Sequence, residues 1–363
     1  MRRVKLGQIC EVVSGGTPKT NVEEYWNGEF NWITPAEIND NDYIISDTKR
    51  KITQLAIEKK KLPLLPKGTV LLSSRAPIGK VAITGKEMYC NQGFKNLICS
   101  DEICNEYLYW YLKSKKEYLN SLGRGATFKE ISKKIVENIE IKLPEIERQR
   151  KIVDKLKKVD KIIQRKKNQS RLLDVVVQAR FVEMFGDPII NNMSWPESTI
   201  GDGCFVTKLA GFEYSKYIEY DDTGDVVMVK AQNVKNGTLN RKDLSFISNE
   251  VSDALPRSQL LPGDVVMTYV GANIGDVAVI DDKYKYHLAP NVAKIRVDAK
   301  IYNSVYFMYM LMFLNSYIVK NSADTAKAAL GMERIRKLKV FIPTYDLQNQ
   351  FAAFVQQVNK SKF

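Results

Sequence analysis

Residues 144–185 read PEIERQRKIVDKLKKVDKIIQRKKNQSRLLDVVVQARFVEMF, with no glycine and with no proline after the first position. Apolar residues recur along this stretch at helical spacing, with one interruption at Lys166 and Ser170: Ile152, Leu156, Val159, Ile163, Leu173, Val177 and Met184. This spacing predicts a helix whose apolar seam packs along another helix. At 1.5 Å per residue, a helix of about 40 residues is roughly 60 Å long. We therefore interpret it as a spacer between two domains.

The length and composition of the chain agree with two domains. The chain has 363 residues, of which 44% are apolar, and each flank of the helix has the size of one typical domain. We predict a first domain at 1–143, the central helix at 144–185, a second domain at 186–343 and a distal helix at 344–363. Strand and turn patterns dominate both flanks, which predicts an α+β fold with mixed, mostly-β sheets.

The second half of the chain repeats the first. LLPKG at 64–68 recurs as LLPGD at 260–264, and IGKVAI at 78–83 recurs as IGDVAV at 274–279, both at an offset of 275 − 79 = 196. Later the offset becomes 199: Gln149 matches Gln348, and Ile152, Leu156 and Val159 match Phe351, Val355 and Val358. A period this long indicates duplication of a whole domain. We expect the two matched helices to pair antiparallel.

Charge and cysteine content narrow the class of protein. The net charge of +13 and the pI near 9.3 favour a polyanionic partner such as nucleic acid, although a basic protein without one has the same composition. The five cysteines show no CxxC or metal-ligand spacing, which predicts free thiols in a reducing compartment. No signal-peptide pattern opens the chain, and its most apolar run, Val305–Leu314, is too short to cross a bilayer. We expect a cytoplasmic protein without a membrane partner.

Catalytic motifs are missing from the sequence. There is one histidine, His287, which we interpret as structural, and there is no GxxxxGK[ST] phosphate loop. The tetrapeptides typical of adenine and cytosine N-methyltransferases and the carboxylate pattern of nucleases are not found either. We predict a chain with no catalytic residue, no metal and no bound cofactor.

The remaining candidates are polar, basic and aromatic residues on predicted loops. Arginine pairs with guanine edges, asparagine and glutamine pair with adenine edges, and lysine holds phosphates, although each candidate taken singly also fits an ordinary surface residue. The loops differ between the copies: 14–18 corresponds to 209–213, and 75–77 to 271–273. This difference predicts two related sites with different targets. The candidate DNA-binding residues are Lys19, Trp32, Arg75, Gln92, Lys95, Arg124 and Lys129 in the first copy, and Lys208, Tyr214, Lys230, Gln232, Asn233, Tyr269, Asn273 and Asn291 in the second.

These features together resemble the specificity (S) subunit of type I restriction–modification enzymes over nearly the whole chain. The resemblance rests on the order of short motifs, which occurs twice, each time before a long helix. In the first copy the motifs are Val4-Lys5-Leu6-Gly7, Ser14-Gly15-Gly16-Thr17-Pro18, Tyr25-Trp26-Asn27-Gly28, Leu65-Pro66-Lys67-Gly68, Ile78-Gly79, Asn91-Gln92-Gly93 and Ile141-Lys142-Leu143-Pro144, with Met184-Phe185-Gly186-Asp187-Pro188 at the join.

The resemblance implies two pseudo-symmetric target-recognition domains that each read one half of a split, asymmetric double-stranded DNA site. It implies an antiparallel coiled coil of the two long helices, which sets the gap between the half-sites. Two methyltransferase (M) subunits that use S-adenosylmethionine and restriction (R) subunits that use ATP and Mg²⁺ are the implied partners. The subunit itself is expected to be non-catalytic.

One feature departs from the family pattern. The distal helix spans about 18 residues, whereas the central one spans about 40. The distal helix is either cut short or naturally short, and a second copy of the chain is one expected source of the missing helix packing. The alternatives to the S subunit are a protein-binding adaptor with duplicated domains and a fused methyltransferase or nuclease. A steep fall of DNA affinity with salt discriminates against the adaptor.

Overall fold

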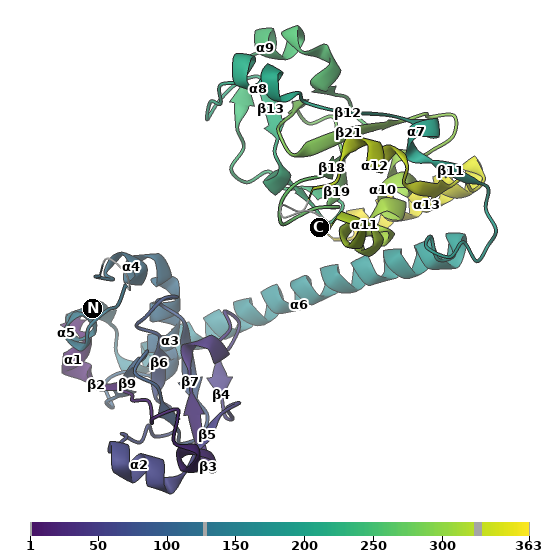
Figure 1. Ribbon diagram of the computed structural model, residues 1–363. Coiled ribbons are helices and arrows are strands. Elements are labelled where there is room, and N and C mark those ends of the chain that lie inside the picture. The colour runs from purple at the N-terminus through teal and green to yellow at the C-terminus, as the bar shows by residue number, and fades with distance from the viewer. Residues whose placement is uncertain (1, 126–128, 323–328, 363) are drawn as a thin grey trace. The chain divides into compact units, whose positions relative to one another are not determined.

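The computed structural model describes residues 2–125, 129–322 and 329–362 (Figure 1). The chain divides into two compact units, one that ends at Arg165 and one that begins at Lys166. The division falls inside the predicted spacer, which is a continuous helix of 40 residues, α6 (Ile146–Phe185). Both units combine mixed sheets with helices, so the predicted α+β class is confirmed.

The first unit is built on a five-stranded sheet with the order β2 (Cys10–Ser14), β9 (Lys95–Cys99), β6 (Val70–Leu72), β7 (Val81–Thr84) and β4 (Ile44–Ile45). A second group of strands has the order β5 (Lys51–Ile52), β3 (Trp26–Ile33) and β8 (Tyr89–Cys90), and β1 (Arg2–Lys5) pairs with β10 (Glu140–Leu143). The helices are α1 (Leu6–Ile9), α2 (Gln54–Lys60), α3 (Asn105–Ser114), α4 (Lys116–Ser121) and α5 (Lys133–Glu137), with 3-10 turns η1 (Glu23–Tyr25) and η2 (Pro35–Glu37).

Strand alternation explains how the layers of the first unit pack. Successive side chains of β6 point to opposite faces of the sheet. Val70 and Leu72 pack with Leu108 of α3, whereas Leu71 packs with Ile33 of β3. Because both faces of the sheet are covered, all three β6 side chains are fully buried.

The second unit has the same layers. One sheet has the order β12 (Cys204–Lys208), β21 (Val292–Val297), β18 (Val265–Thr268) and β19 (Val277–Val279), and the other has the order β16 (Phe246–Ile247), β13 (Val226–Val229), β20 (Lys285–Leu288) and β17 (Gln259–Leu260). Two short pairs are β11 (Glu197–Thr199) with β22 (Lys339–Phe341), and β14 (Val234–Lys235) with β15 (Thr238–Leu239). The helical elements are α7 (Ile200–Gly203), α8 (Gly211–Tyr217), α9 (Asn249–Ala254), α10 (Ser304–Phe313), α11 (Asn315–Ser322), α12 (Met332–Arg336), α13 (Tyr345–Lys360), η3 (Ala231–Asn233) and η4 (Pro256–Ser258).

Equivalent turns confirm the duplication and correct its register in one place. Gly79 and Gly275 both have positive φ, +88° and +82°, at the predicted offset of 196. Gly68 and Gly263 both have φ +90°, but their offset is 263 − 68 = 195. The predicted match of Pro66 with Pro262 was therefore wrong by one position. The turn geometry that only glycine adopts easily fixes the alignment, whereas the shared Leu-Leu-Pro letters do not.

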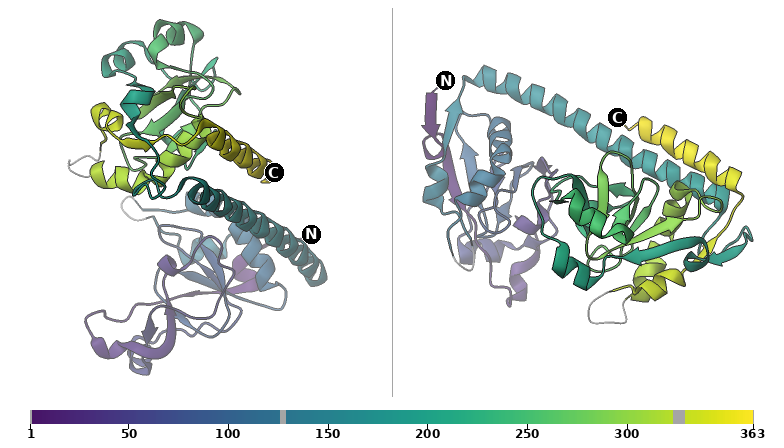
Figure 2. Two further views of the ribbon diagram at one scale, coloured as in Figure 1. Left: turned by 90° about the vertical axis from the view of Figure 1, so that its right-hand side faces the viewer. Right: turned by 90° about the horizontal axis from the view of Figure 1, so that it is seen from above.

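Helix α13 packs antiparallel against the C-terminal half of α6 within the second unit (Figure 2). Phe351 of α13 lies beside Phe181 and Phe185 of α6, with ring centroids 5.4 and 5.5 Å apart. Near the other end of α13, the Lys362 ammonium lies 2.5 Å from the Asp174 carboxylate. The predicted seam residues Leu173, Val177, Phe351, Val355 and Val358 all belong to this core.

The N-terminal half of the predicted seam is arranged differently. Leu156, Val159 and Ile163 are 37%, 53% and 45% exposed, and Ile152 is half-buried. Because α13 extends along α6 only as far as the neighbourhood of Asp174, no described segment covers these three side chains. The short distal helix already leads us to expect that one end of the central seam lacks a partner helix within this chain. Among the described helices, none is both long enough and apolar enough to span a membrane.

Candidate nucleic-acid interface

Loops of the first unit meet where β2 and β6 end and β9 begins. Gly16 N–H donates to Cys90 O (2.9 Å), and Ser74 N–H donates to Gly93 O (2.8 Å). A Cβ on Gly15 would lie 2.3 Å from Cys90 O, so this approach of the two loops requires glycine. We call residues 14–18, 73–77, 90–94 and 129–131 the first loop edge.

Three predicted DNA-binding residues converge on Glu130 at the first loop edge. The Glu130 carboxylate accepts hydrogen bonds from Arg75 Nε (3.0 Å) and Lys95 Nζ (3.1 Å), and its backbone pairs with that of Arg124 through two bonds of 3.0 Å. Burial alone would raise the pKa of Glu130, but the bonds from Lys95 and Arg75 hold that pKa below its ordinary value. Arg75, Arg124 and Lys129 are exposed, so the edge presents positive charge.

Two other predicted residues of the first unit are exposed on neighbouring loops. Gln92 accepts a hydrogen bond from the Thr17 hydroxyl. Lys19 accepts at its carbonyl oxygen a bond from Trp26 Nε1–H (3.2 Å). Arg50, which the sequence analysis missed, is exposed and stacks over Trp26, with its guanidinium carbon 3.8 Å from the ring centroid. No local pattern indicates this cation–π contact, because the partners lie 50 − 26 = 24 positions apart.

Three predicted contact residues are buried instead. Trp32 is 2% exposed and donates from Nε1 to Gly16 O (3.0 Å). Lys95 is 8% exposed, and Asn233 is 2% exposed and donates to the carbonyl oxygens of Asn240 and Lys242. Their assignment to accessible loops was wrong. Trp32 and Lys95 lie in strands β3 and β9, and Asn233 lies in the turn η3, where it ties down the loop that follows.

The second unit forms an equivalent edge from residues 208–211, 268–273, 289–292 and 329–331, which we call the second loop edge. Tyr269 N–H donates to Asn291 O (2.9 Å), and Leu330 N–H donates to Tyr269 O (2.8 Å). Lys208 Nζ lies 5.5 Å from the centroid of the Tyr269 ring. Asn273 and Asn291 are exposed. Four predicted residues therefore gather at this edge.

Two other accessible candidates of the second unit, Lys230 and Tyr214, gather around Tyr220. Lys230 Nζ donates to Ser245 Oγ (2.9 Å) and lies 5.9 Å from the Tyr220 ring centroid. The Tyr214 and Tyr220 ring centroids are 6.1 Å apart. Gln232 is exposed. This cluster and the second loop edge are two distinct groups of predicted residues.

The two loop edges share their backbone pairing and differ in their side chains. Arg75 and Glu130 form an isolated β-bridge in the first unit, and Val270 and Ala329 form the equivalent bridge in the second. The predicted counterpart of Arg75, Gly271, was wrong by one position because the second loop is one residue longer. The scaffold is thus preserved while the charge on it is not.

The histidine and the cysteines are the other reactive side chains, and they lie in buried or half-buried positions. His287 is fully buried, with Nδ1 3.0 Å from Leu288 O, and burial lowers its pKa. All five cysteines are free thiols, as predicted: Cys10, Cys90, Cys99, Cys104 and Cys204. Among the described residues, no group of histidine, cysteine and carboxylate side chains is arranged to hold a metal ion.

Comparison with known proteins places this architecture. Residues 1–171 and residues 192–362 match the family described as the type I restriction modification DNA specificity domain. The chain belongs to this family. Its two matches correspond to the two duplicated units, so each unit contains one specificity domain.

Individual relatives agree with the family. The chain is 30% identical over 373 residues to the type I restriction enzyme MjaIX specificity subunit of Methanocaldococcus jannaschii, covering 97% of this chain and 85% of that protein. A crystal structure of a type I restriction–modification S subunit from M. genitalium shares the fold, with a TM-score of 0.55, 15% identity and coverage of 99% and 90%. A chain from a study of complex assembly in the type I system gives a TM-score of 0.54, 18% identity and the same coverage.

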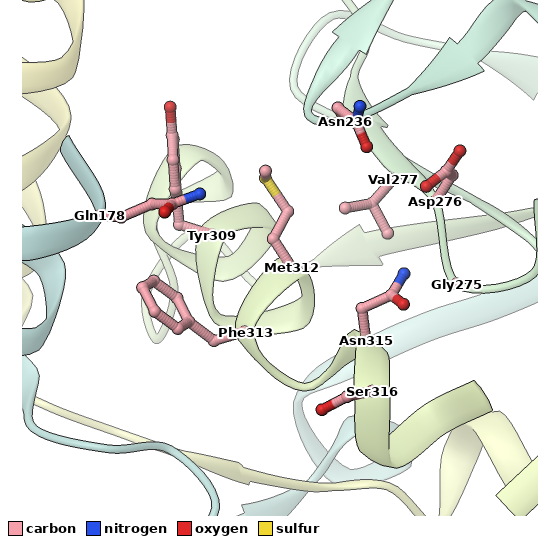
Figure 3. A pocket seen from close by; sticks show the side chains of 10 residues that line it. All are labelled: Gln178, Asn236, Gly275, Asp276, Val277, Tyr309, Met312, Phe313, Asn315 and Ser316. Carbon is pink, nitrogen blue, oxygen red and sulfur yellow. The ribbon is translucent and has the colours of Figure 1, made fainter. Parts of the chain in front are cut away.

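The second specificity domain also contains a pocket of about 380 Å³ (Figure 3). The ring of Tyr309 and the side chain of Gln178 lie on one side of it, and Asn236 and Asp276 lie on the other. Burial raises the pKa of Asp276. The other residues that line the pocket are Gly275, Val277, Met312, Phe313, Asn315 and Ser316.

The first specificity domain has the opposite charge at the equivalent positions. Lys80 follows Gly79 in the first domain, and Asp276 follows Gly275 in the second. A Cβ on Gly79 would meet Lys116, and a Cβ on Gly275 would meet Asn315. A basic residue in the first domain thus stands where the second has an acid.

Proposed function

We propose that this chain is the DNA-recognition subunit of a type I restriction–modification enzyme and that its two loop edges read two unlike half-sites. The observation that carries the proposal is the pair of equivalent bridges, Arg75–Glu130 and Val270–Ala329. Because the backbone pairing is the same in both units, it places the loops in the same way. The different side chains on these loops change which bases each unit prefers. The expected target is therefore split and asymmetric.

Helix α6 supports the role of a spacer in this proposal. Its 40 residues make a rod of roughly 60 Å, longer than one turn of DNA at about 34 Å. Neither unit then needs to contact the bases between the two half-sites. The chain works in the cytoplasm and binds no cofactor itself.

Two methyltransferase subunits dock on this scaffold and methylate adenine with S-adenosylmethionine. Restriction subunits that use ATP dock on it as well. The exposed seam of α6 (Leu156, Val159 and Ile163) offers an apolar surface for helix packing. Alternatively, a second copy of the chain occupies this surface. The mass of the purified chain alone and with the methyltransferase subunit separates the two.

The deciding experiment maps methylation. The chain is co-expressed with its candidate methyltransferase subunit, and methylated adenines are located across a genome by long-read sequencing. We expect one motif with two unlike halves and a fixed gap. A palindromic motif would contradict the assignment of one half-site to each loop edge.

A salt titration of DNA binding is the control against a protein-binding adaptor. The affinity of a subunit that contacts several phosphates falls steeply as salt rises. Affinity that stays constant between about 50 and 200 mM salt would favour the adaptor.

A further inference from the structure

The ion cluster of the first loop edge leaves one donor surface unused. Glu130 engages only Nε of Arg75, and no described residue accepts a hydrogen bond from the two terminal amino groups of that guanidinium. The Arg75 side chain is 47% exposed. The Lys95 side chain is only 10% exposed, so its charge neutralises Glu130 from inside. The cluster therefore presents one net positive charge, on the free end of Arg75.

The backbone fixes Glu130 in place. Its N–H and C=O both pair with Arg124, and the next residue, Ile131, is fully buried and donates to Ser74 O (2.9 Å). Glu130 is thereby joined to the loop that contains Arg75. A carboxylate held in this way restricts the rotamers of a long arginine side chain, which lowers the entropy cost of ordering it on a ligand.

The second unit forms the same backbone bridge without this cluster. It closes the same bridge with Val270 and Ala329 and keeps the bond from Leu330 N–H to Tyr269 O. Lys208 of β12 pairs with Ala293 of β21, just as Ser14 of β2 pairs with Lys95 of β9. Ala293 is therefore the counterpart of Lys95. All three charged members are thus replaced by Val270, Ala293 and Ala329. The cluster is therefore specific to the first unit, which agrees with a role in reading the half-site of that unit.

We propose that Glu130 is a positioning residue that holds Arg75 so that its two terminal amino groups read one guanine in the half-site of the first unit. Two parallel donors match the O6 and N7 acceptors that guanine shows in the major groove. Lys95 balances the Glu130 charge and does not contact the DNA. The second unit reads its half-site without an arginine at this position. This inference rests on the proposed DNA-recognition function.

The test measures base preference in the assembled methyltransferase. The complex is supplied with a DNA library randomised at both half-sites, and methylated products are sequenced. Wild type selects guanine at one position of the first half-site. Glu130→Gln, which keeps the shape and removes the charge, lowers that selection about tenfold, within the range for a bidentate contact. Selection in the second half-site stays unchanged.

A double-variant cycle tests whether Glu130 acts through Arg75. Adding Glu130→Gln to Arg75→Ala should change the base preference no further. Further relaxation in the double variant, equal loss in both half-sites, or an unchanged profile in Glu130→Gln would each overturn the inference. If wild type itself yields no split motif, the proposed function fails instead.

A transplant variant separates recognition from folding. Arg75→Val, Lys95→Ala and Glu130→Ala together give the first loop edge the side chains of the second. This variant should keep a melting temperature near that of wild type, lose the guanine preference and keep the second half-site. Unfolding of the triple variant would show that the cluster is structural and would overturn the inference. Glu137→Gln, at an ion pair with Lys133 in the first unit, is the matched control that leaves the guanine preference intact.

Discussion

Gln149 and Gln348, 199 positions apart, make the same three hydrogen bonds in the two units. Each amide nitrogen donates to the carbonyl oxygen of the proline five positions earlier (2.8 and 2.9 Å) and to a second carbonyl 47 positions away (2.9 and 3.0 Å). Each amide oxygen accepts a backbone N–H at 2.8 Å, from Cys104 or from Asn303. Both side chains are fully buried. They fix the start of each seam helix to its own unit.

Replacing Gln348 with leucine should destabilise the second unit by about 3 kcal/mol. The substitution leaves a buried N–H and two buried carbonyl groups without these partners, and one such loss costs about 1–3 kcal/mol. Urea denaturation followed by circular dichroism measures the change. Gln350→Leu, on the exposed side of the same helix, is the control and should cost less than about 0.5 kcal/mol. Equal effects of the two substitutions would refute the anchoring role.

Phe351→Ala should lower the stability of the helix pair by about 4 kcal/mol. Its fully buried ring contacts the rings of Phe181, Phe185 and Tyr309, and removal of a buried phenylalanine costs about 3–5 kcal/mol. Val159→Ala, at a 53% exposed position of the same seam pattern, should change the stability of the isolated chain little. Thermal unfolding of both variants measures the difference. A large loss in Val159→Ala would mean that the N-terminal seam is packed in solution.

Lys294 should make the stability of the second unit depend on alkaline pH. Its ammonium is buried, donates to the carbonyl oxygens of Arg257 and Gln259 (2.6 and 2.9 Å), and desolvation lowers its pKa to about 8. In the unfolded chain this group has the ordinary lysine pKa, about 10.4. Between these values the unfolded state binds more protons, so folding becomes more favourable as pH rises.

The measurement is the unfolding free energy of wild type minus that of Lys294→Met as a function of pH. This difference should increase by about 2 kcal/mol from pH 8 to pH 10, since each unit of pKa difference corresponds to about 1.4 kcal/mol. Lys300→Met removes an exposed lysine of the same unit and should give a flat difference. A flat difference for Lys294→Met as well would show that its pKa is ordinary.

A seven-residue insertion between Arg165 and Lys166 should lengthen the gap between the half-sites. Seven residues add about 10.5 Å of helix and turn its phase by only about 20°. The gap should grow by one to three base pairs, because each step along DNA is about 3.4 Å. Methylome mapping of the variant with its methyltransferase subunit gives the new gap, and an unchanged gap would remove the spacer role. A substitution such as Lys166→Glu at the same place is the control without a change of length.

The sequence alone was sufficient for the helix, the duplication and the family. Helical periodicity is a local property, so α6 was predicted to begin within two residues of Ile146 and to end at Phe185. The duplication was visible because turns such as those at Gly79 and Gly275 need the same residue type for the same backbone reason. Both signals depend on near neighbours in the chain, which the sequence displays directly.

The tertiary structure alone decided which candidate residues are accessible and which act together. Trp32 and Lys95 have the composition of a binding loop, but strand pairing and long-range packing bury them. Arg75 and Glu130, 55 positions apart, meet because a backbone bridge joins their segments, and no local pattern encodes that meeting. The exposure of Val159 depends on how far α13 extends along α6. Burial and ion pairing are properties of contacts between distant segments, so they follow from the folded arrangement.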